Sequence, residues 1–409
     1  MEEKRTPQLR FPEFQGEWEE KKLEDLSSKI GDGIHSTPVY DDYGEYFFIN
    51  GNNLVDGKVV FNETTKKVSE EEFTNHKNNL EELTLLLSIN GTIGNIAFYN
   101  NEKVLLGKSA AYINFQDKTL QKFLYHLLQT HNVKRFFNSE LTGTTIRNLS
   151  LKTIRSTKLL IPSLPEQEKI ATFLTTVDKR IGLLTEKKAQ LEQYKKGVMQ
   201  QLFSQQIRFT QANGTPYPDW EEKKLGKVFS IFNGYAFSSA DSSDNGVRWI
   251  KIADVGIDMI NDENKSFLPT EFSEKHKKFL LNEGDYVVAL TRPYLNHKLK
   301  IARISKAELP ALLNQRVGKI ETNNNLEFIY QLLHHNELSY KIENNIAGTD
   351  PPNLSPNEIK NLKLLIPSLP EQQKIAAFLS AIDARIATVQ QQIIQTQTWK
   401  QGLLQGMFV

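Results

Sequence analysis

The sequence predicts an α+β protein in which a long antiparallel two-helix coiled coil separates two mixed α/β globular domains, with an internal pseudo-two-fold duplication. Two observations predict this fold class. A block of 24 residues occurs twice along the chain, and a long heptad pattern of apolar residues follows each copy. Repeats are considered first because an overlooked repeat leads to a wrong assignment of the whole fold.

The duplication is explicit at the ends of the repeated unit. Lys158–Ile181 reads KLLIPSLPEQEKIATFLTTVDKRI, and Lys363–Ile386 reads KLLIPSLPEQQKIAAFLSAIDARI, so that 18 of 24 positions agree at an offset of 205 residues. Each unit also begins alike, because Trp18–Leu23 and Trp220–Leu225 both read WEEKKL. Since the same pieces recur in the same order, a chance match is excluded.

The middles of the two copies are unlike. Gly31–Phe115 and Gly234–Ile320 share only a faint outline, which includes one apolar strand in each copy, at Leu85–Ile89 and Tyr286–Leu290. Matching ends with unlike middles lead to the hypothesis that a shared frame carries two different recognition surfaces. We expect two globular domains, at 1–164 and 207–369, and two long helices, at 165–206 and 370–409.

The heptad pattern predicts helices of about 38 residues, or about 57 Å at roughly 1.5 Å per residue. Pro165 and Pro370 suit a first helical turn, where Glu166 and Glu371 are favourable near the positive end of the helix. We expect the two helices to pair with each other, although packing on their own domains and an intermolecular coil remain alternatives. The predicted seam residues are Ile170, Leu174, Val177, Ile181, Leu184, Ile375, Leu379, Ile382, Ile386 and Val389.

Composition restricts the classes of function. The chain contains no cysteine, which excludes disulfides, thiolate zinc sites and a cysteine nucleophile, and which fits a cytoplasmic location. No signal peptide and no membrane-spanning run are recognisable. Neither a phosphate-binding loop nor an HExxH zinc motif occurs, so we assign no catalytic, cofactor-binding or metal-binding residue. The net charge of +1 argues weakly against a bulk nucleic-acid coat.

Local clusters of polar and basic residues are candidates for DNA contact. Lys265–Lys306 contains nine Lys and Arg against four Asp and Glu, a local excess of +5. Arg, Asn and Gln can contact base edges, whereas Lys mostly contacts phosphates. Taken singly, each candidate is more often a solvated loop residue. The candidates are His35, Ser36, Thr37, Asn90, Thr92, Lys108 and Arg147 in the first copy, and Tyr235, Arg292, Tyr294, Lys298, Lys300, Gln315 and Arg316 in the second.

The duplicated KLLIPSLPEQ blocks, each of which opens a long helix behind an unlike domain, closely resemble the specificity subunit of type I restriction-modification systems. The resemblance covers essentially the whole chain. Shorter pieces support it, namely RFPEFQGEWEEKKL, GDGIHSTPVY and GTIGNIAFY in the first copy, and NGYAFSS and LLNQRV in the second.

This resemblance implies a non-catalytic subunit with two target-recognition domains, each of which reads one half of a split, asymmetric double-stranded DNA site. It implies two methyltransferase subunits docked on the helices, together with restriction and translocation subunits. S-adenosylmethionine, ATP and Mg would then be bound by those partners, and no membrane is involved. One alternative is a coiled-coil scaffold that binds proteins without reading DNA, and a more remote one is a stand-alone methyltransferase or nuclease.

Overall fold

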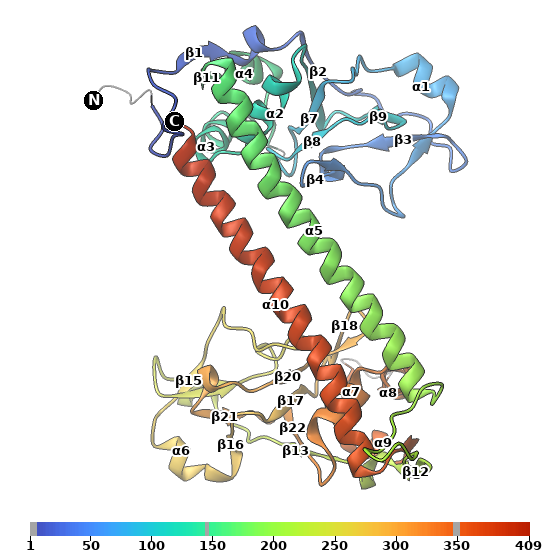
Figure 1. The fold of residues 1–409 in the computed structure, drawn as a ribbon. Helices are drawn as coiled ribbons and strands as arrows, with labels where there is room; N and C mark the ends of the chain where they lie inside the picture. Colours follow the sequence, from blue (N-terminus) through green and yellow to red (C-terminus); the bar gives the residue numbers. More distant parts are fainter. Residues whose placement is uncertain (1–5, 144–146, 347–351) are drawn as a thin grey trace. The chain divides into compact units, whose positions relative to one another are not determined.

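The computed structural model describes residues 6–143, 147–346 and 352–409, without the side chains of residues 356 and 358. The chain divides into two compact units. The first unit is Met1–Glu186 with Gln390–Val409, and the second unit is Lys187–Val389. Helices α5 (Leu164–Phe203) and α10 (Leu369–Met407) each contribute one part to either unit (Figure 1). Within the described ranges, no helix is long and apolar enough to cross a membrane.

The first unit is built around a four-stranded antiparallel sheet in the order β2-β10-β7-β8. Its strands are β2 (Lys29–Asp32), β7 (Thr84–Ser88), β8 (Ile96–Phe98) and β10 (Ala110–Asn114). A second sheet, β6-β3-β9, consists of β3 (Tyr46–Ile49), β6 (Lys67–Val68) and β9 (Val104–Leu106), with β3 and β9 parallel. Two further pairs of strands lie outside these sheets. Strand β1 (Glu19–Lys22) pairs with β11 (Lys158–Ile161), and β4 (Leu54–Val55) pairs with β5 (Lys58–Val59). The short helices are α1 (Glu70–His76), α2 (Lys118–Leu127), α3 (His131–Ser139) and α4 (Leu151–Ser156).

The second unit repeats this plan. Its main sheet, β13-β22-β17-β20, consists of β13 (Ser230–Asn233), β17 (Tyr286–Ala289), β20 (Ile301–Arg303) and β22 (Val317–Glu321). Its second sheet, β15-β14-β21-β16, consists of β14 (Val247–Ile250), β15 (Phe267–Leu268), β16 (Leu280–Leu281) and β21 (Ala311–Leu313), with β14 and β21 parallel. The strand pairs are β12 (Glu221–Lys224) with β23 (Lys363–Ile366), and β18 (Tyr294–Leu295) with β19 (Lys298–Leu299). The short helices are α6 (Phe272–Lys275), α7 (Leu326–His334), α8 (Asn336–Ile346) and α9 (Pro356–Ile359).

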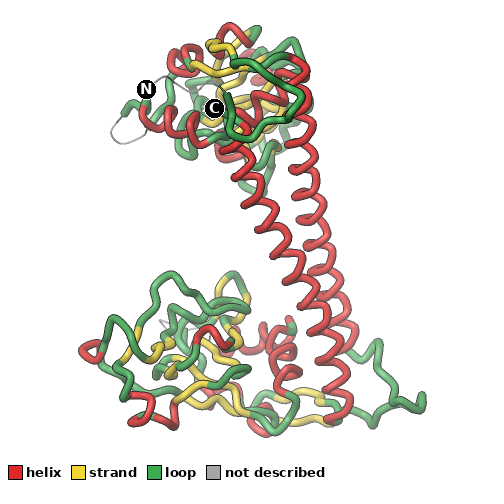
Figure 2. Tube along the Cα trace, turned by 60° about the vertical axis from the view of Figure 1, so that its left-hand side comes forward, coloured by secondary structure: helices red, strands yellow, loops and turns green. Residues whose placement is uncertain are grey.

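The predicted fold class is confirmed, and the duplication extends into the unlike middles. The two apolar strands expected from the sequence are β7 and β17, which occupy the same place in equivalent sheets. Both are fully buried, which explains their continuous apolar runs. Figure 2 shows strands and short helices beside the long helices in each unit.

The repeated IPSLPEQ segment builds the same helix start twice. Helix α5 begins at Leu164, and the side-chain amide of Gln167 donates to the carbonyl oxygen of Pro162 at 2.9 Å. In α10, Gln372 makes the equivalent bond to Pro367 at 3.0 Å. This bond links the segment between strand and helix to the first turn of the helix and gives the carbonyl of the Pro a hydrogen-bond partner, which accounts for the repeated Gln.

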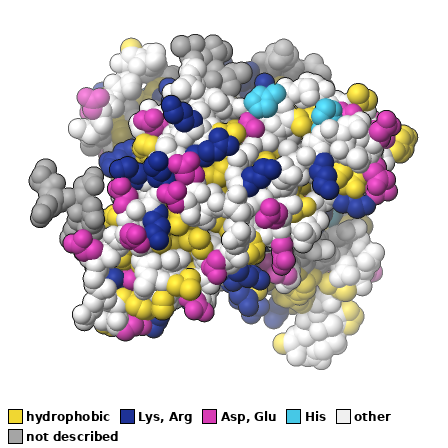
Figure 3. Space-filling model, turned by 90° about the horizontal axis from the view of Figure 1, so that it is seen from above, with side chains coloured by type: hydrophobic (Ala, Val, Ile, Leu, Met, Phe, Trp, Pro, Cys, Tyr) yellow, Lys and Arg dark blue, Asp and Glu magenta, His cyan; other side chains and the backbone are white. Residues whose placement is uncertain are grey.

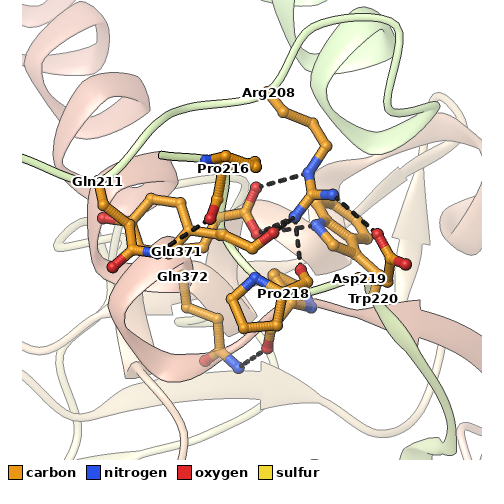
Figure 4. A network of polar contacts seen from close by, with 10 residues as sticks. Arg208, Gln211, Pro216, Pro218, Asp219, Trp220, Glu371 and Gln372 are labelled. Atoms are coloured by element: carbon orange, nitrogen blue, oxygen red, sulfur yellow. Dashed lines mark hydrogen bonds and ion pairs between the residues drawn. The ribbon is translucent and has the colours of Figure 1, made fainter. Parts of the chain in front are cut away.

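Each Glu of this segment is a buried anchor. Glu166 accepts from Arg10 Nε and Nη2, both at 2.8 Å, and Glu371 accepts from Arg208 Nε at 3.1 Å and Nη2 at 2.9 Å. Trp220 Nε1 also donates to Glu371 at 3.1 Å, as Figure 4 shows. A bidentate Arg–carboxylate pair is strong and directional, so these contacts fix the chain that precedes each WEEKKL strand onto the start of a long helix.

The two helices pair antiparallel within each unit. The end of α10 contributes Phe408, which packs on Trp18 and Phe123 with ring centroids 6.2 and 5.4 Å apart. In the second unit, Phe203 at the end of α5 packs in the same way on Trp220 and Phe328. The pairing is therefore intramolecular. The helix starts also pack on their own domains, so two readings that the sequence left as alternatives both hold.

The predicted seam residues are all buried or half-buried. Ile170, Leu174 and Val177 belong to the core of the first unit, with Ile181 at its margin. Ile375, Leu379 and Ile382 belong to the core of the second unit, and Ile386 lies at its margin. Val389 is buried, whereas Leu184 is half-buried.

Interhelical ion pairs recur at the 205-residue offset. Lys400 Nζ lies 2.7 Å from Asp178 Oδ1, and Lys195 Nζ lies 2.6 Å from Asp383 Oδ1. In a parallel, in-register arrangement, Asp178 would instead meet Asp383 and Lys195 would meet Lys400. Since partly buried like charges repel, these pairs select the antiparallel arrangement and its register.

The two copies differ beside these ion pairs, and the difference predicts a pH dependence. His126 on α2 is buried, with its Nδ1 3.8 Å from Asp178 Oδ2, whereas the equivalent Gln331 donates to Asp383 at 2.7 Å. Burial, together with the charge of Lys400, lowers the pKa of His126 to about 3. In the unfolded chain, His126 therefore binds a proton near pH 6.5, whereas in the folded unit it stays neutral until the pH is near 3.

We expect the first unit to lose stability as the pH falls from about 6.5 toward 3, by about 2 kcal/mol at pH 5. His126→Gln, which copies the second unit, should remove most of this loss. Hydrogen exchange of α2 amides at pH 7 and pH 5 measures it, with α7 amides as the internal control. An equal loss in the parent and the variant would contradict the assignment.

Candidate nucleic-acid interface

In each unit, one end of the main sheet gathers four chain segments. In the first unit, β2 and β7 end where β10 and β8 begin, because Ala111 pairs with Asp32 and Ala110 pairs with Ser88. The second unit repeats this geometry through Gly318 with Asn233, and Val317 with Ala289. We call the connecting residues at this end the loop edge. The loop edge comprises 33–37, 89–95, 107–109 and 147–148 in the first unit, and 234–236, 290–300, 314–316 and 352–353 in the second.

Close backbone contacts assemble the loop edge of the first unit. Ile34 forms a parallel bridge with Gly107, so the next residues of the two segments, His35 and Lys108, lie side by side. Gly33 is required there, because a Cβ on it would lie 2.3 Å from the carbonyl oxygen of Gly107. Asn90 bridges to Asn148 and donates from Nδ2 to the carbonyl oxygen of Lys108 at 3.3 Å.

The structure therefore brings the sequence-predicted residues of the first copy to one edge. Ser36 and Thr37 continue outward from His35, Thr92 lies in the turn after Asn90, and Arg147 precedes Asn148. Apart from the half-buried Asn90, all of these side chains are exposed. The His35 ring is paired with Asp32 at 2.9 Å.

The second unit assembles its loop edge with the same contacts and different side chains. Tyr235 forms a parallel bridge with Asn314, and Thr291 bridges to Asn353. Arg292 has a φ of +48° and donates its backbone N–H to the carbonyl oxygen of Pro352 at 2.7 Å. Gln315 and Arg316 follow Asn314 and are exposed. Positions 108 and 315 are thus structurally equivalent, with Lys in one unit and Gln in the other.

The remaining candidates lie on the β18–β19 hairpin and differ in availability. Lys298 is exposed. Lys300 is half-buried, and burial together with Arg292 lowers its pKa. The Tyr294 hydroxyl donates to the carbonyl oxygen of Ser339 at 2.9 Å, and burial raises the pKa of Tyr294 to about 12. That hydroxyl therefore stays protonated and anchors the hairpin on α8.

Tyr235 is 42% exposed, but its ring packs on His276 and Phe279 at centroid distances of 4.4 and 5.3 Å. One face of the ring is thus occupied by the protein. Sequence reasoning did not single out Leu295 or His297 at the hairpin tip, or the bridging pair Asn148 and Asn353. The two Asn residues carried a signal, because they occupy corresponding places in the duplication.

Among the described residues, the face drawn in Figure 3 has no broad region of one charge. On the face drawn in Figure 3, Lys and Arg are interspersed with Asp and Glu. This agrees with the net charge of +1. This face therefore does not suit DNA binding through a broad basic surface.

Two equivalent sheets on one duplicated frame carry unlike polar loop edges, an arrangement typical of a recognition protein with two different domains. The sequence family described as the type I restriction modification DNA specificity domain matches residues 15–193 and again 217–397. The chain belongs to this family, and its function is DNA target recognition by two domains. The alternative of a scaffold that reads no DNA is not favoured.

Known relatives cover nearly the whole chain. The type I restriction enzyme MjaVIII specificity subunit of Methanocaldococcus jannaschii is 28% identical, over 97% of this chain and 92% of its own length. The MjaIX specificity subunit of the same organism is 24% identical over 95% and 92%. The crystal structure of the S subunit of a type I system from M. genitalium shares the fold, with a TM-score of 0.63, 18% identity and 99% of both chains covered.

Proposed function

We propose that each loop edge reads one half of a split DNA site, and that the two half-sites differ in sequence. The observation that supports this is the convergence of polar residues, chosen from the sequence separately in each copy, on the same edge of equivalent sheets. Because the side chains at equivalent positions are unlike, one half-site cannot satisfy both edges. The complete site is then asymmetric.

The side chains at the two edges suit different bases. In the second unit, Gln315 can pair bidentately with adenine, and Arg292 or Arg316 can pair with guanine. In the first unit, Lys108 can contact guanine or a phosphate, and Arg147 lies on the neighbouring segment. His35, Ser36, Thr37, Asn90 and Thr92 complete that edge, while Lys298 and Lys300 supply charge for phosphates in the other.

We also propose that the chain is not itself an enzyme and that methyltransferase and restriction subunits perform the chemistry. S-adenosylmethionine, ATP and Mg would be bound by those partners. Exposed apolar residues recur on the long helices at the 205-residue offset, as Leu164 with Leu369, and Tyr194 with Trp399. A surface present twice on otherwise unlike units supports docking of two copies of one partner, which fits two methyltransferase subunits.

The equivalent positions 108 and 315 provide a matched test. We expect Lys108→Ala to change base preference in one half-site only and Gln315→Ala to change it in the other only, each by about 1–3 kcal/mol where a base contact is lost. The measurement is selection of randomised duplexes by the complex with its methyltransferase partner, followed by sequencing. Lys187→Ala, on an exposed face of α5, is the control.

A single variant that changed both half-sites would contradict separate reading. If neither Lys108→Ala nor Gln315→Ala changed the selected sequences, the loop edge would not be the reading surface. Turnover of DNA by the purified chain alone would overturn the non-catalytic assignment.

A further inference from the structure

The two loop edges differ in one connection. Between β7 and β8 the first unit has seven residues, 89–95, whereas the equivalent connection between β17 and β20 in the second unit has eleven, 290–300. The additional length forms the β18–β19 hairpin, in which Tyr294 pairs with Leu299, and Leu295 pairs with Lys298. The second unit thus carries a hairpin at the place where its duplicate has a short turn.

The base of this hairpin is fixed to the unit. Pro293 and Leu299 are buried, and the backbone N–H of Lys300 donates to the carbonyl oxygen of Pro293 at 2.7 Å. The hydroxyl of Tyr294 is bonded to Ser339 on α8. At the turn, His297 Nδ1 lies 3.1 Å from Glu343 Oε1, also on α8, so α8 holds the hairpin at both its base and its turn. An element held in this way by α8 can present its exposed side chains with little loss of conformational entropy on binding.

The turn is solvent-exposed apart from its contact with α8. Asn296 and His297 have φ values of +50° and +59°, as the two central residues of a type I′ turn do. Leu295 is 53% exposed, and Asn296 and Lys298 are exposed as well. About half of the Leu295 surface is thus available to a ligand.

The charge of the hairpin is of one sign. The stretch 290–303 contains Lys and Arg at four positions, and it contains neither Asp nor Glu. Two of these cations, Arg292 and Lys300, lie close enough for Arg292 to lower the pKa of Lys300. A polyanionic ligand relieves this repulsion, and a DNA backbone supplies regularly spaced negative charge.

We propose that the β18–β19 hairpin enters the major groove of the half-site read by the second unit, and this rests on the function proposed above. The major groove admits a two-stranded β-ribbon, whereas the minor groove is about half as wide. Asn296 then faces the base edges, where it recognises adenine. Leu295 contacts a thymine methyl group, and Lys298 lies along the phosphates.

The test uses the complex with its methyltransferase partner and a randomised duplex library. Asn296→Ala and Leu295→Ala, both on exposed side chains, should each reduce discrimination at one or two base pairs by roughly 5- to 150-fold. These positions should lie in the half-site that Gln315→Ala alters, with the other half-site unchanged. A second variant replaces Thr291–Lys300 with the shorter NGTIGN turn of the first unit, and Lys224→Ala on β12 is the control.

Modified duplexes identify the groove. On the selected sequence, 7-deazapurines remove major-groove acceptors, and inosine in place of guanine removes only the minor-groove amino group. We expect the parent to lose affinity with 7-deazapurines in that half-site and to tolerate inosine. The shortened variant should lose this sensitivity at the base pairs that Asn296→Ala alters and keep it at those that Gln315→Ala alters. Sensitivity to inosine alone would overturn the major-groove placement.

The outcomes separate the two proposals. If Asn296→Ala, Leu295→Ala and the shortened variant all select the parental sequence while Gln315→Ala still alters one half-site, the hairpin proposal fails and the function of the loop edge stands. If none of the four variants changes selection, both fail.

Discussion

Removal of residues 397–409 should unfold the first unit and leave the second unit folded. The deleted segment contributes Leu403, Leu404, Met407 and Phe408 to the core of the first unit, although it is far in the sequence from the rest of that unit. Each side chain stabilises by about 1.5–3 kcal/mol when fully buried, so together they supply about 6–12 kcal/mol. That is comparable to the whole stability of a typical domain, about 5–15 kcal/mol.

The truncation also removes Lys400, the ion-pair partner of Asp178, and the carbonyl of Gly406 that accepts from the backbone N–H of Leu9 at 2.7 Å. Hydrogen exchange resolved along the sequence measures the effect, with fast exchange expected in β7 and β10 and unchanged protection in β17 and β22. Protected strands in both units would show that the first unit does not depend on α10.

A pair of point variants provides the matched control. Phe408→Ala should destabilise only the first unit, by about 3–5 kcal/mol, because Phe408 is 5% exposed and packs on Trp18 and Phe123. Phe203→Ala should destabilise only the second unit, and by less, because Phe203 is half-buried. Reversed or equal effects on the two units would contradict the packing of each helix end in the unit where the other long helix begins.

The sequence predicts the frame well because the frame is repeated and periodic. The offset of 205 residues predicts both long helices, and the heptad pattern predicts positions that are buried or half-buried in them, such as Ile170 and Val389. The topology of the middles was not predictable, because strands such as β6 and β15 contain two residues and their pairing is decided by tertiary contacts. The loop edge likewise depends on pairings such as Ile34 with Gly107, between residues far apart in the chain.

The two Glu residues at the helix starts have a larger role than the sequence indicates. Glu166 and Glu371 were expected to stabilise helix starts through the helix dipole, which is a surface effect of a few tenths of a kcal/mol. The structure buries both carboxylates almost completely and pairs them with Arg10 and Arg208. Spacing could not reveal this, since more than 150 residues separate the members of each pair.

Glu371→Ala should therefore destabilise the second unit far more than loss of a helix-dipole contact would. Glu371 is 0% exposed and accepts hydrogen bonds from Arg208 and Trp220. Its removal leaves the guanidinium with only the exposed Asp219, 3.5 Å from Nη1, as counter-ion, and leaves the indole N–H without an acceptor. Breaking a buried pair typically costs about 3–5 kcal/mol, and we expect about 3 kcal/mol, because the Arg208 side chain remains 23% exposed. Denaturant unfolding followed by hydrogen exchange in the second unit measures this.

The duplicate provides the sharpest control, because Glu166 binds Arg10 but, within the described residues, Trp18 Nε1 has no hydrogen-bond partner. A double-mutant cycle between Glu371→Ala and Trp220→Phe should give a coupling energy of about 1 kcal/mol, the typical value of one hydrogen bond. The cycle between Glu166→Ala and Trp18→Phe should give a coupling near zero. Equal coupling in both cycles would mean that the indole bond does not distinguish the two anchors, and that the destabilisation comes from the Arg–Glu pair alone.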